Sequence, residues 1–142
     1  MAPGCGYYLD TFSNLESPPA RSIHKADGSE WAVFAPADRV IEIGPGRGAL
    51  TVQLAKVVAA LTAVEIDRDL VPGLRGRLPG HVRVIEGDFL DVPAAQLFDA
   101  GGGAPWRVIG NLPYNVSSPI LFRLLDLAQA GDRLRDATLM LQ

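Results

Sequence analysis

The chain has 142 residues, of which 48% are hydrophobic and 20% are charged, and this balance fits a single globular domain with an apolar core. The formal net charge of −3 argues against a protein that binds nucleic acid through a basic surface of its own, and the only cysteine, Cys5, excludes a disulfide framework and a cysteine-based zinc site. Because the sequence contains no apolar run of membrane-spanning length and no evident secretory signal, we expect a cytoplasmic protein that does not bind a membrane. We also expect a monomer without a bound metal.

Residues 1–37 show no persistent helical or alternating pattern. Glycine and proline interrupt this part repeatedly, for example at Gly4, Pro18, Pro19 and Gly28. We therefore expect an irregular N-terminal arm before the first regular element.

From residue 38 onward, strand patterns and helix patterns alternate. Strands are expected at 40–43, 61–66, 82–88, 107–110 and 137–141. Helices are expected at 49–60, around Leu70 to Leu78, at about 93–98 and at about 118–130. This order predicts βαβ units with right-handed crossovers, and hence an α/β fold in which helices cover both faces of a parallel sheet.

Two of the expected helices carry apolar residues that we expect to be buried. In the helix at 49–60 they are Leu50, Leu54, Val57 and Val58. In the helix at 118–130 they are Leu121, Phe122, Leu124, Leu125 and Leu127.

A glycine-rich turn, Gly44-Pro45-Gly46-Arg47-Gly48, joins the first of these strands to the first helix. Glycine is needed where the backbone approaches a ligand closely or adopts a positive φ. A dinucleotide-binding turn would space its glycines as Gly-x-Gly-x-x-Gly, so that a pyrophosphate meets the helix. The spacing found here favours a nucleoside that carries an amino acid instead of phosphates, which describes S-adenosylmethionine. The alternative is a turn that needs its glycines only for packing.

An acidic residue ends each of the next two expected strands. The carboxylate of Glu65 can accept hydrogen bonds from both hydroxyls of a ribose. The carboxylate of Asp88 can accept from the amino group of the cofactor's adenine, with Ile66 and Phe89 holding the ring. The alternatives are a solvated acid for Glu65 and a helix N-cap for Asp88.

The fourth strand ends in Ile109-Gly110-Asn111-Leu112-Pro113-Tyr114-Asn115, at the edge where open α/β sheets bind their ligands. Asn111 offers a side-chain carbonyl, Pro113 a stiffly held backbone carbonyl and Tyr114 a flat face for stacking. Two acceptors and an aromatic face suit a planar group with an exocyclic amine, such as adenine. The alternative is an ordinary turn between a strand and a helix.

Three segments resemble those of the ribosomal RNA adenine dimethyltransferases, which modify two adjacent adenines near the 3′ end of small-subunit ribosomal RNA. The segments are Val40-Ile41-Glu42-Ile43-Gly44-Pro45-Gly46-Arg47-Gly48-Ala49-Leu50-Thr51, Val64-Glu65-Ile66-Asp67 and Gly110-Asn111-Leu112-Pro113-Tyr114-Asn115-Val116-Ser117-Ser118-Pro119-Ile120-Leu121. The resemblance covers about residues 38–142. The macrolide-resistance ribosomal RNA methyltransferases are close relatives that usually carry isoleucine in place of Leu112, which favours the housekeeping branch.

The resemblance implies a Rossmann-like methyltransferase fold that uses S-adenosylmethionine, with ribosomal RNA of the small subunit as partner and adenine N6 as the dimethylated group. It implies that Asn111, Leu112, Pro113 and Tyr114 form the catalytic turn. The residues expected to bind the cofactor are Gly44, Gly46, Gly48, Glu65, Ile66, Asp88, Phe89 and Asn111.

Two parts of the family pattern have no counterpart in the sequence. One is a Gln-x-Phe-Leu segment that precedes the first strand, and the other is a small C-terminal helical domain that supplies basic RNA-binding surface. We therefore expect a truncated member, with an arm at 1–37, a partial methyltransferase core at 38–142 and a sheet that is incomplete after its fifth strand.

Three rival functions stay open at this point. A DNA adenine-N6 or protein glutamine-N5 methyltransferase has a similar turn but usually carries proline in place of Leu112. A non-catalytic RNA-binding or transcription-factor relative would keep the fold and lose the chemistry. A nicotinamide-dependent oxidoreductase is disfavoured by the spacing of the glycines.

Overall fold

A five-stranded parallel sheet forms the centre of the molecule. The computed structural model describes residues 8–9, 21–98, 103–131 and 133–141. The strands stand in the order β6-β5-β4-β7-β8, and every neighbouring pair is parallel. Their bounds are β4 Arg39–Ile43, β5 Ala60–Glu65, β6 Val82–Glu86, β7 Trp106–Leu112 and β8 Leu134–Leu141. Helices alternate with these strands along the chain, as predicted, since parallel neighbouring strands require a crossover connection.

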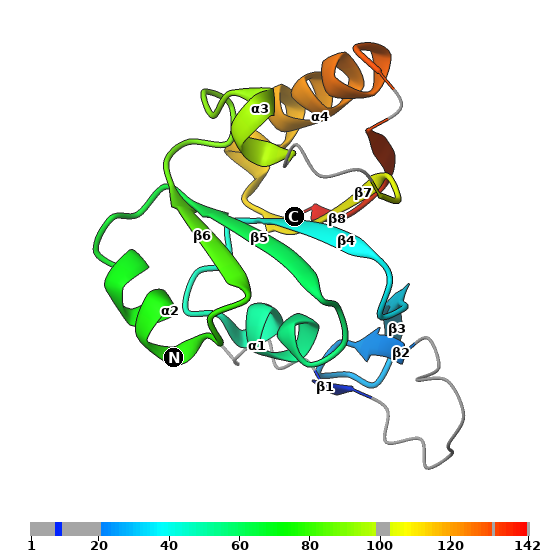
Figure 1. Cartoon of the computed structure of the whole chain (residues 1–142), viewed down its shortest axis with the longest axis vertical. Coiled ribbons are helices and arrows are strands. Elements are labelled where there is room, and N and C mark those ends of the chain that lie inside the picture. Colours follow the sequence, from blue (N-terminus) through cyan, green and yellow to red (C-terminus); the bar gives the residue numbers. More distant parts are fainter. Residues whose placement is uncertain (1–7, 10–20, 99–102, 132, 142) are drawn as a thin grey trace.

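Helices cover both faces of this sheet, as the sequence pattern predicted. Figure 1 shows α1 (Ala49–Ala55) and α2 (Val71–Arg77) on one face, with α3 (Ala94–Leu97) and α4 (Tyr114–Gln129) on the other. None of the helices in the described part of the chain combines the length and the apolar character needed to cross a membrane.

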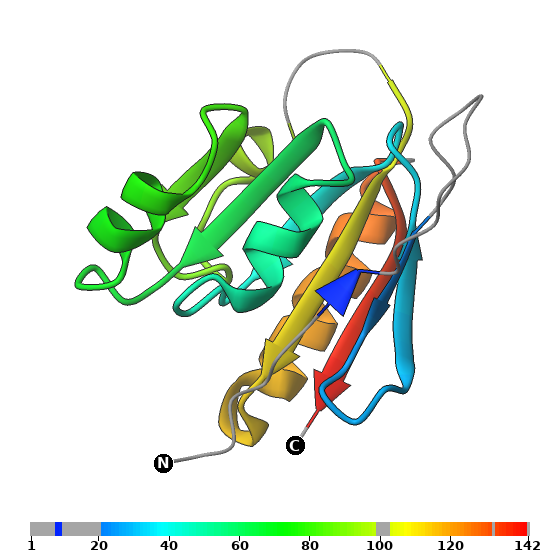
Figure 2. The ribbon, with the colours of Figure 1, turned by 90° about the horizontal axis from the view of Figure 1, so that it is seen from below.

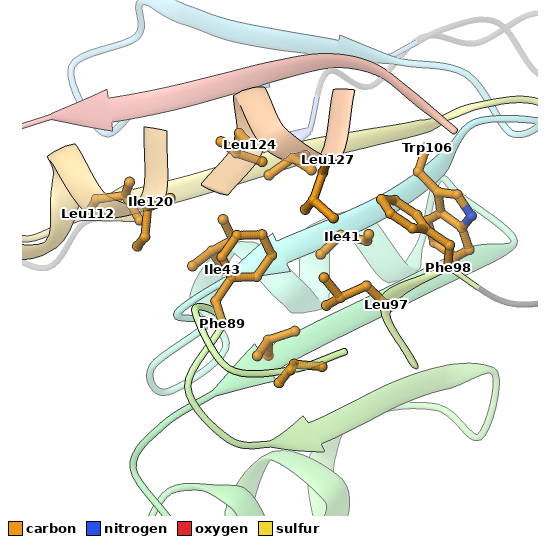
Figure 3. Packing of buried hydrophobic residues seen from close by; sticks show 13 residues of the cluster. Ile41, Ile43, Phe89, Leu97, Phe98, Trp106, Leu112, Ile120, Leu124 and Leu127 are labelled. Atoms are coloured by element: carbon orange, nitrogen blue, oxygen red, sulfur yellow. The ribbon is translucent and has the colours of Figure 1, made fainter. Parts of the chain in front are cut away.

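Each face of the sheet has its own apolar cluster. Because successive side chains of a strand point to opposite faces, β4 contributes Ile41 and Ile43 to the cluster under α3 and α4 and Val40 to the cluster under α1. Figure 3 shows the first cluster, in which the rings of Phe98 and Trp106 lie with their centroids 6.5 Å apart. The two clusters hold β4 between them, so the turn that follows β4 starts from a rigid position.

The expectation of an irregular N-terminal arm is wrong for the part that the structure describes. β1 (Tyr8–Leu9), β2 (Arg21–His24) and β3 (Glu30–Phe34) form an antiparallel sheet, which lies beside the large sheet in Figure 2. Ile23, Ala32 and Phe34 are buried in the cluster under α1. Asp27-Gly28 is the signal in the sequence for the hairpin of β2 and β3, and Gly28 adopts φ 86° between these two short strands.

Arg107 of β7 connects this small sheet to the large one. Its guanidinium donates to the backbone carbonyl of Val33 at 2.7 Å, to Asp38 at 2.9 Å and to Asp136 at 2.9 Å. The same group lies 4.6 Å from the ring centroid of Phe34. Burial lowers the pKa of Arg107, but the hydrogen bonds and charges of Asp136 and Asp38 outweigh this effect and raise the pKa overall. The small sheet is therefore anchored by a permanent charge.

The bounds of two helices differ from the predicted ones. α1 ends at Ala55 instead of residue 60, because the chain turns at the β-branched pair Val57-Val58 and already enters β5 at Ala60. α4 begins at Tyr114 instead of about residue 118, directly after Pro113. The early start carries the helix up to the expected catalytic turn.

The predicted buried face of α4 is only partly correct. Leu124 and Leu127 are buried as expected, together with Ile120, and these positions form one stripe along the helix. Leu121, Phe122 and Leu125 are exposed. Their positions lie one to two residues away from the stripe and therefore face outward. The predicted burial of Leu50, Leu54, Val57 and Val58 is confirmed.

Candidate functional site

A cavity of about 350 Å³ opens at the carboxyl ends of β4, β5, β6 and β7. Most of the residues expected at the site contribute to its wall. They are Gly44, Gly46, Glu65, Ile66, Asp88, Phe89, Asn111, Leu112 and Pro113. Strands that are distant in the sequence meet here because the sheet is parallel and all four carboxyl ends share one edge.

Two expected site residues, Gly48 and Tyr114, do not line this cavity. Gly48 precedes α1 with φ 87°, and a Cβ atom there would come within 2.9 Å of Leu74 Cδ2. Because glycine has no Cβ atom, α1 and α2 can pack closely at this position. Tyr114 is the first residue of α4, and 78% of its surface is exposed.

Glu65 supports the glycine turn from the end of β5. Its side chain is buried, and Oε2 accepts a hydrogen bond from the backbone N–H of Gly46 at 2.8 Å. Oε1 accepts from the backbone N–H of Asp67 at 2.9 Å. Each carboxylate oxygen has a second acceptor site, so Glu65 can hold the turn and still bind hydroxyl groups in the cavity.

Asp88 fulfils the local role that the sequence left as an alternative. Its Oδ1 accepts from the backbone N–H of Leu90 at 2.9 Å, which closes the turn after β6. Oδ2 has no partner among the described residues and remains an acceptor at the cavity wall. Phe89 beside it is buried in the core, whereas Ile66, which lines the same cavity, is 67% exposed.

The residues of the expected catalytic turn differ in how deeply they are buried. Asn111 is half-buried on β7, and Leu112 is buried in the apolar cluster under α4. Pro113 is exposed, and its carbonyl accepts from the backbone N–H of Val116 at 3.2 Å. This carbonyl keeps one lone pair for another donor. Leu112 therefore fixes the turn through the core, while its neighbours present polar groups.

Glu42 was not among the expected site residues, although an acid within the apolar run Val40-Ile41-Glu42-Ile43 was the signal for it. It is only 2% exposed, and its Oε2 has no partner among the described residues. Burial raises the pKa of Glu42 to about 8; the Thr51 hydroxyl opposes this rise, and the nearby Glu65 carboxylate adds to it. A carboxyl group of this kind is largely protonated at neutral pH.

Glu42 lines a second cavity of about 220 Å³, which has Gly44, Gly46 and Asn111 in common with the first. The two cavities thus adjoin across the glycine turn and the end of β7. Within the described ranges of the chain, no group of three or more histidine, cysteine, aspartate or glutamate residues could hold a metal ion.

A family model described as "Ribosomal RNA adenine dimethylase" matches residues 21–142. The match begins upstream of residue 38, where the resemblance in the sequence began, and so includes β2 and β3. The structure explains this difference, since both strands pack on the same core as the methyltransferase-like sheet.

Curated relatives carry the name "Ribosomal RNA small subunit methyltransferase A". The chain is 50% identical to the one from Geobacter sulfurreducens over 107 residues, which cover 74% of this chain and 38% of the relative. It is 52% identical to the one from Bordetella petrii over 112 residues, which cover 77% and 40%. The chain therefore spans about two fifths of the length of these relatives.

Solved structures show the same fold. The 23S rRNA methyltransferase ErmE has a TM-score of 0.61 at 32% identity, over 76% of this chain and 41% of that one. A dimethyladenosine transferase from Plasmodium falciparum has a TM-score of 0.59 at 27% identity, over 76% and 37%. The predicted Rossmann-like methyltransferase fold is thus confirmed.

Proposed function

The chain belongs to the ribosomal RNA adenine dimethylase family, and from this premise we propose that it dimethylates adenine N6 in small-subunit ribosomal RNA with S-adenosylmethionine as methyl donor. The observation that carries the proposal is the convergence of Glu65, Asp88 and Asn111 on one cavity. The family model and the curated relatives bear ribosomal RNA names, so a DNA or protein glutamine methyltransferase and a non-catalytic relative are not favoured. The cytoplasmic location and the monomeric state stay predictions of the sequence.

The side chains around the first cavity fit a nucleoside. Ile66 and Phe89 offer apolar surface for a purine ring, and Asp88 Oδ2 is an acceptor for its amino group. Glu65 is placed to accept from ribose hydroxyls. S-adenosylmethionine supplies an electrophilic methyl group when it is bound there.

The target adenine is a weak nucleophile at N6, because its lone pair is delocalised into the ring. Asn111 Oδ1 and the Pro113 carbonyl would each accept a hydrogen bond from one N–H group of this amine. These two bonds would hold the nitrogen in the geometry that exposes its lone pair. Pro113 has the lone pair needed for this, since Val116 uses only one.

Tyr114 completes the proposed target site from outside the cavity. Its ring is 78% exposed at the start of α4 and is therefore available to stack on a base. A base must leave its own stack to reach such a site, which is easier from an RNA loop than from a duplex.

A methyl-transfer assay tests the proposed function. The chain is incubated with methyl-labelled S-adenosylmethionine and small ribosomal subunits whose RNA lacks the modification. Label on adenine N6 of the ribosomal RNA is the expected result. Label in DNA or on protein glutamine would overturn the substrate assignment, and cofactor binding without transfer to any of these acceptors would indicate a non-catalytic relative.

A further inference from the structure

The second cavity contains one basic and one acidic side chain that the proposed function has not yet used. Arg47 and Glu42 both line this space of about 220 Å³, together with Asn111 and with glycine, proline and apolar residues. The structure records no ion pair between the two side chains. Each is therefore available to a ligand.

Arg47 is the exposed member of this pair. It lies between two glycines of the turn after β4, and its guanidinium makes no ion pair or hydrogen bond with any residue that the structure describes. A guanidinium presents a planar fork of donors that matches a carboxylate or a phosphate. Arg47 can therefore bind an anionic group that enters this cavity.

Glu42 limits which kind of anionic ligand fits this cavity. Its carboxyl group is buried at the same cavity, and Oε2 has no partner among the described residues. An α-amino acid group offers Oε2 of Glu42 an ammonium donor, which favours the ionised form of the acid, and it offers Arg47 a carboxylate. An RNA phosphate has no cation for Glu42, so the pair together fits the two charged groups of an amino acid.

We propose that Arg47 binds the carboxylate of the amino-acid end of S-adenosylmethionine and so selects this cofactor over analogues that lack the carboxylate. This inference rests on the proposed function, which places the nucleoside end in the first cavity. The two cavities share Gly44, Gly46 and Asn111. One ligand can therefore lie across the glycine turn, with its nucleoside on one side and its amino acid on the other.

The test compares two ligands by titration calorimetry of the chain: S-adenosylmethionine and decarboxylated S-adenosylmethionine. The wild type is expected to bind S-adenosylmethionine at least about tenfold more tightly than the decarboxylated ligand. This is the effect expected when a ligand loses one charge-assisted hydrogen-bonded pair. Arg47→Gln should weaken binding of S-adenosylmethionine by about the same factor and leave binding of the decarboxylated ligand unchanged. Arg47→Lys should retain part of the preference, because it keeps the charge and loses the fork.

Arg68→Gln is the matched control, because Arg68 is exposed, has no partner among the residues that the structure describes and lines neither cavity. It should bind both ligands like the wild type. The proposal would be overturned if Arg47→Gln weakened the binding of both ligands equally, or if it weakened the binding of neither. If neither affinity changes and the same variant binds ribosomal RNA more weakly, Arg47 instead contacts a phosphate. If the wild type binds neither ligand, the proposed function itself fails.

Discussion

The backbone N–H of Gly46 donates a hydrogen bond of 2.8 Å to Oε2 of Glu65. This bond ties the turn after β4 to the end of β5, while Oε1 of the same carboxylate holds the backbone of Asp67 at 2.9 Å. The acid expected to bind a ribose therefore also shapes the glycine turn on which the cofactor would lie. Support of the loop and binding of the ligand are thus coupled through one side chain.

Replacing Glu65 by Gln tests this coupling. The amide keeps the shape of the side chain but turns one acceptor into a donor, which would face a backbone N–H. We expect the free energy of unfolding to fall by about 1–3 kcal/mol, as for a buried donor that loses its acceptor. Affinity for S-adenosylhomocysteine should fall about tenfold or more. Denaturant unfolding and calorimetry measure the two effects.

Glu86→Gln is the control for this experiment. Glu86 ends β6 opposite Glu65 in the strand register, but its side chain is exposed. It should change neither stability nor affinity appreciably. If Glu65→Gln, like Glu86→Gln, kept the wild-type stability and affinity, Glu65 would not be part of the site.

Replacing Asn111 by Ala should abolish methyl transfer while the fold stays intact. Asn111 is half-buried at the end of β7, and its side chain faces both cavities. Loss of an acceptor that positions the reacting amine should lower the rate about 100-fold or more. Label incorporation into ribosomal RNA measures the rate, and circular dichroism checks the fold. Turnover at the wild-type rate would refute the role of Asn111.

Tyr114 permits a test of stacking that is free of stability effects, since most of its surface is exposed. Tyr114→Ala should leave thermal unfolding unchanged and lower methyl transfer strongly. Tyr114→Phe keeps the flat ring and should retain most of the activity. Equal activity of the Ala and Phe variants would show that the ring does not contact the target base.

The sequence predicted the sheet and the edge that carries the site because both depend on local patterns. Runs such as Val40 to Ile43 are largely apolar, which is typical of buried parallel strands. Parallel strands then bring Glu65, Asp88 and Asn111 to one edge regardless of the details of packing. The predicted start of α4 at about residue 118 was wrong because proline usually stands in the first turn of a helix, whereas α4 contains Pro119 in its interior.

Other features depend on contacts between distant segments and could not be predicted from local patterns. The hairpin of β2 and β3 is stabilised by burial of Ile23 and Phe34 against α1 and by Arg107, which is 74 residues from Val33. The exposure of Phe122 depends on which stripe of α4 meets the sheet. The raised pKa of Glu42 follows from its burial, and the apolar run around it hints at this burial without showing its extent.

Gly48 is predicted to matter for packing and not for ligand contact. Gly48→Ala would place a side chain at φ 87° and a Cβ atom 2.9 Å from Leu74 Cδ2. We expect a loss of about 1–3 kcal/mol in the free energy of unfolding, from backbone strain and overpacking. Gly76→Ala is the control, because a Cβ at this position in α2 meets no atom within 4 Å. It should be neutral or stabilise by up to about 1 kcal/mol.

Glu42 should make stability fall as the pH rises. The pKa of its carboxyl group is about 8 in the folded chain and has its ordinary value of 4.5 when unfolded. Between these values the folded state keeps a proton that the unfolded state has released, so each rise in pH favours unfolding. Below pH 4.5 both states are protonated and the effect vanishes; above pH 8 both are ionised and the full penalty of burying the charge is present.

Glu42→Gln removes this dependence, because an amide of the same shape has no proton to lose. The gain in the free energy of unfolding relative to the wild type should be small near pH 4.5 and should grow to roughly 3–5 kcal/mol above pH 8, at about 1.4 kcal/mol per pKa unit. Urea unfolding of both chains across this pH range measures the difference. The Glu86→Gln variant, whose acid is exposed, should show no such growth. A difference that stays constant with pH would mean that Glu42 is ionised in the folded chain, and the buried carboxyl would then need a cation beside it.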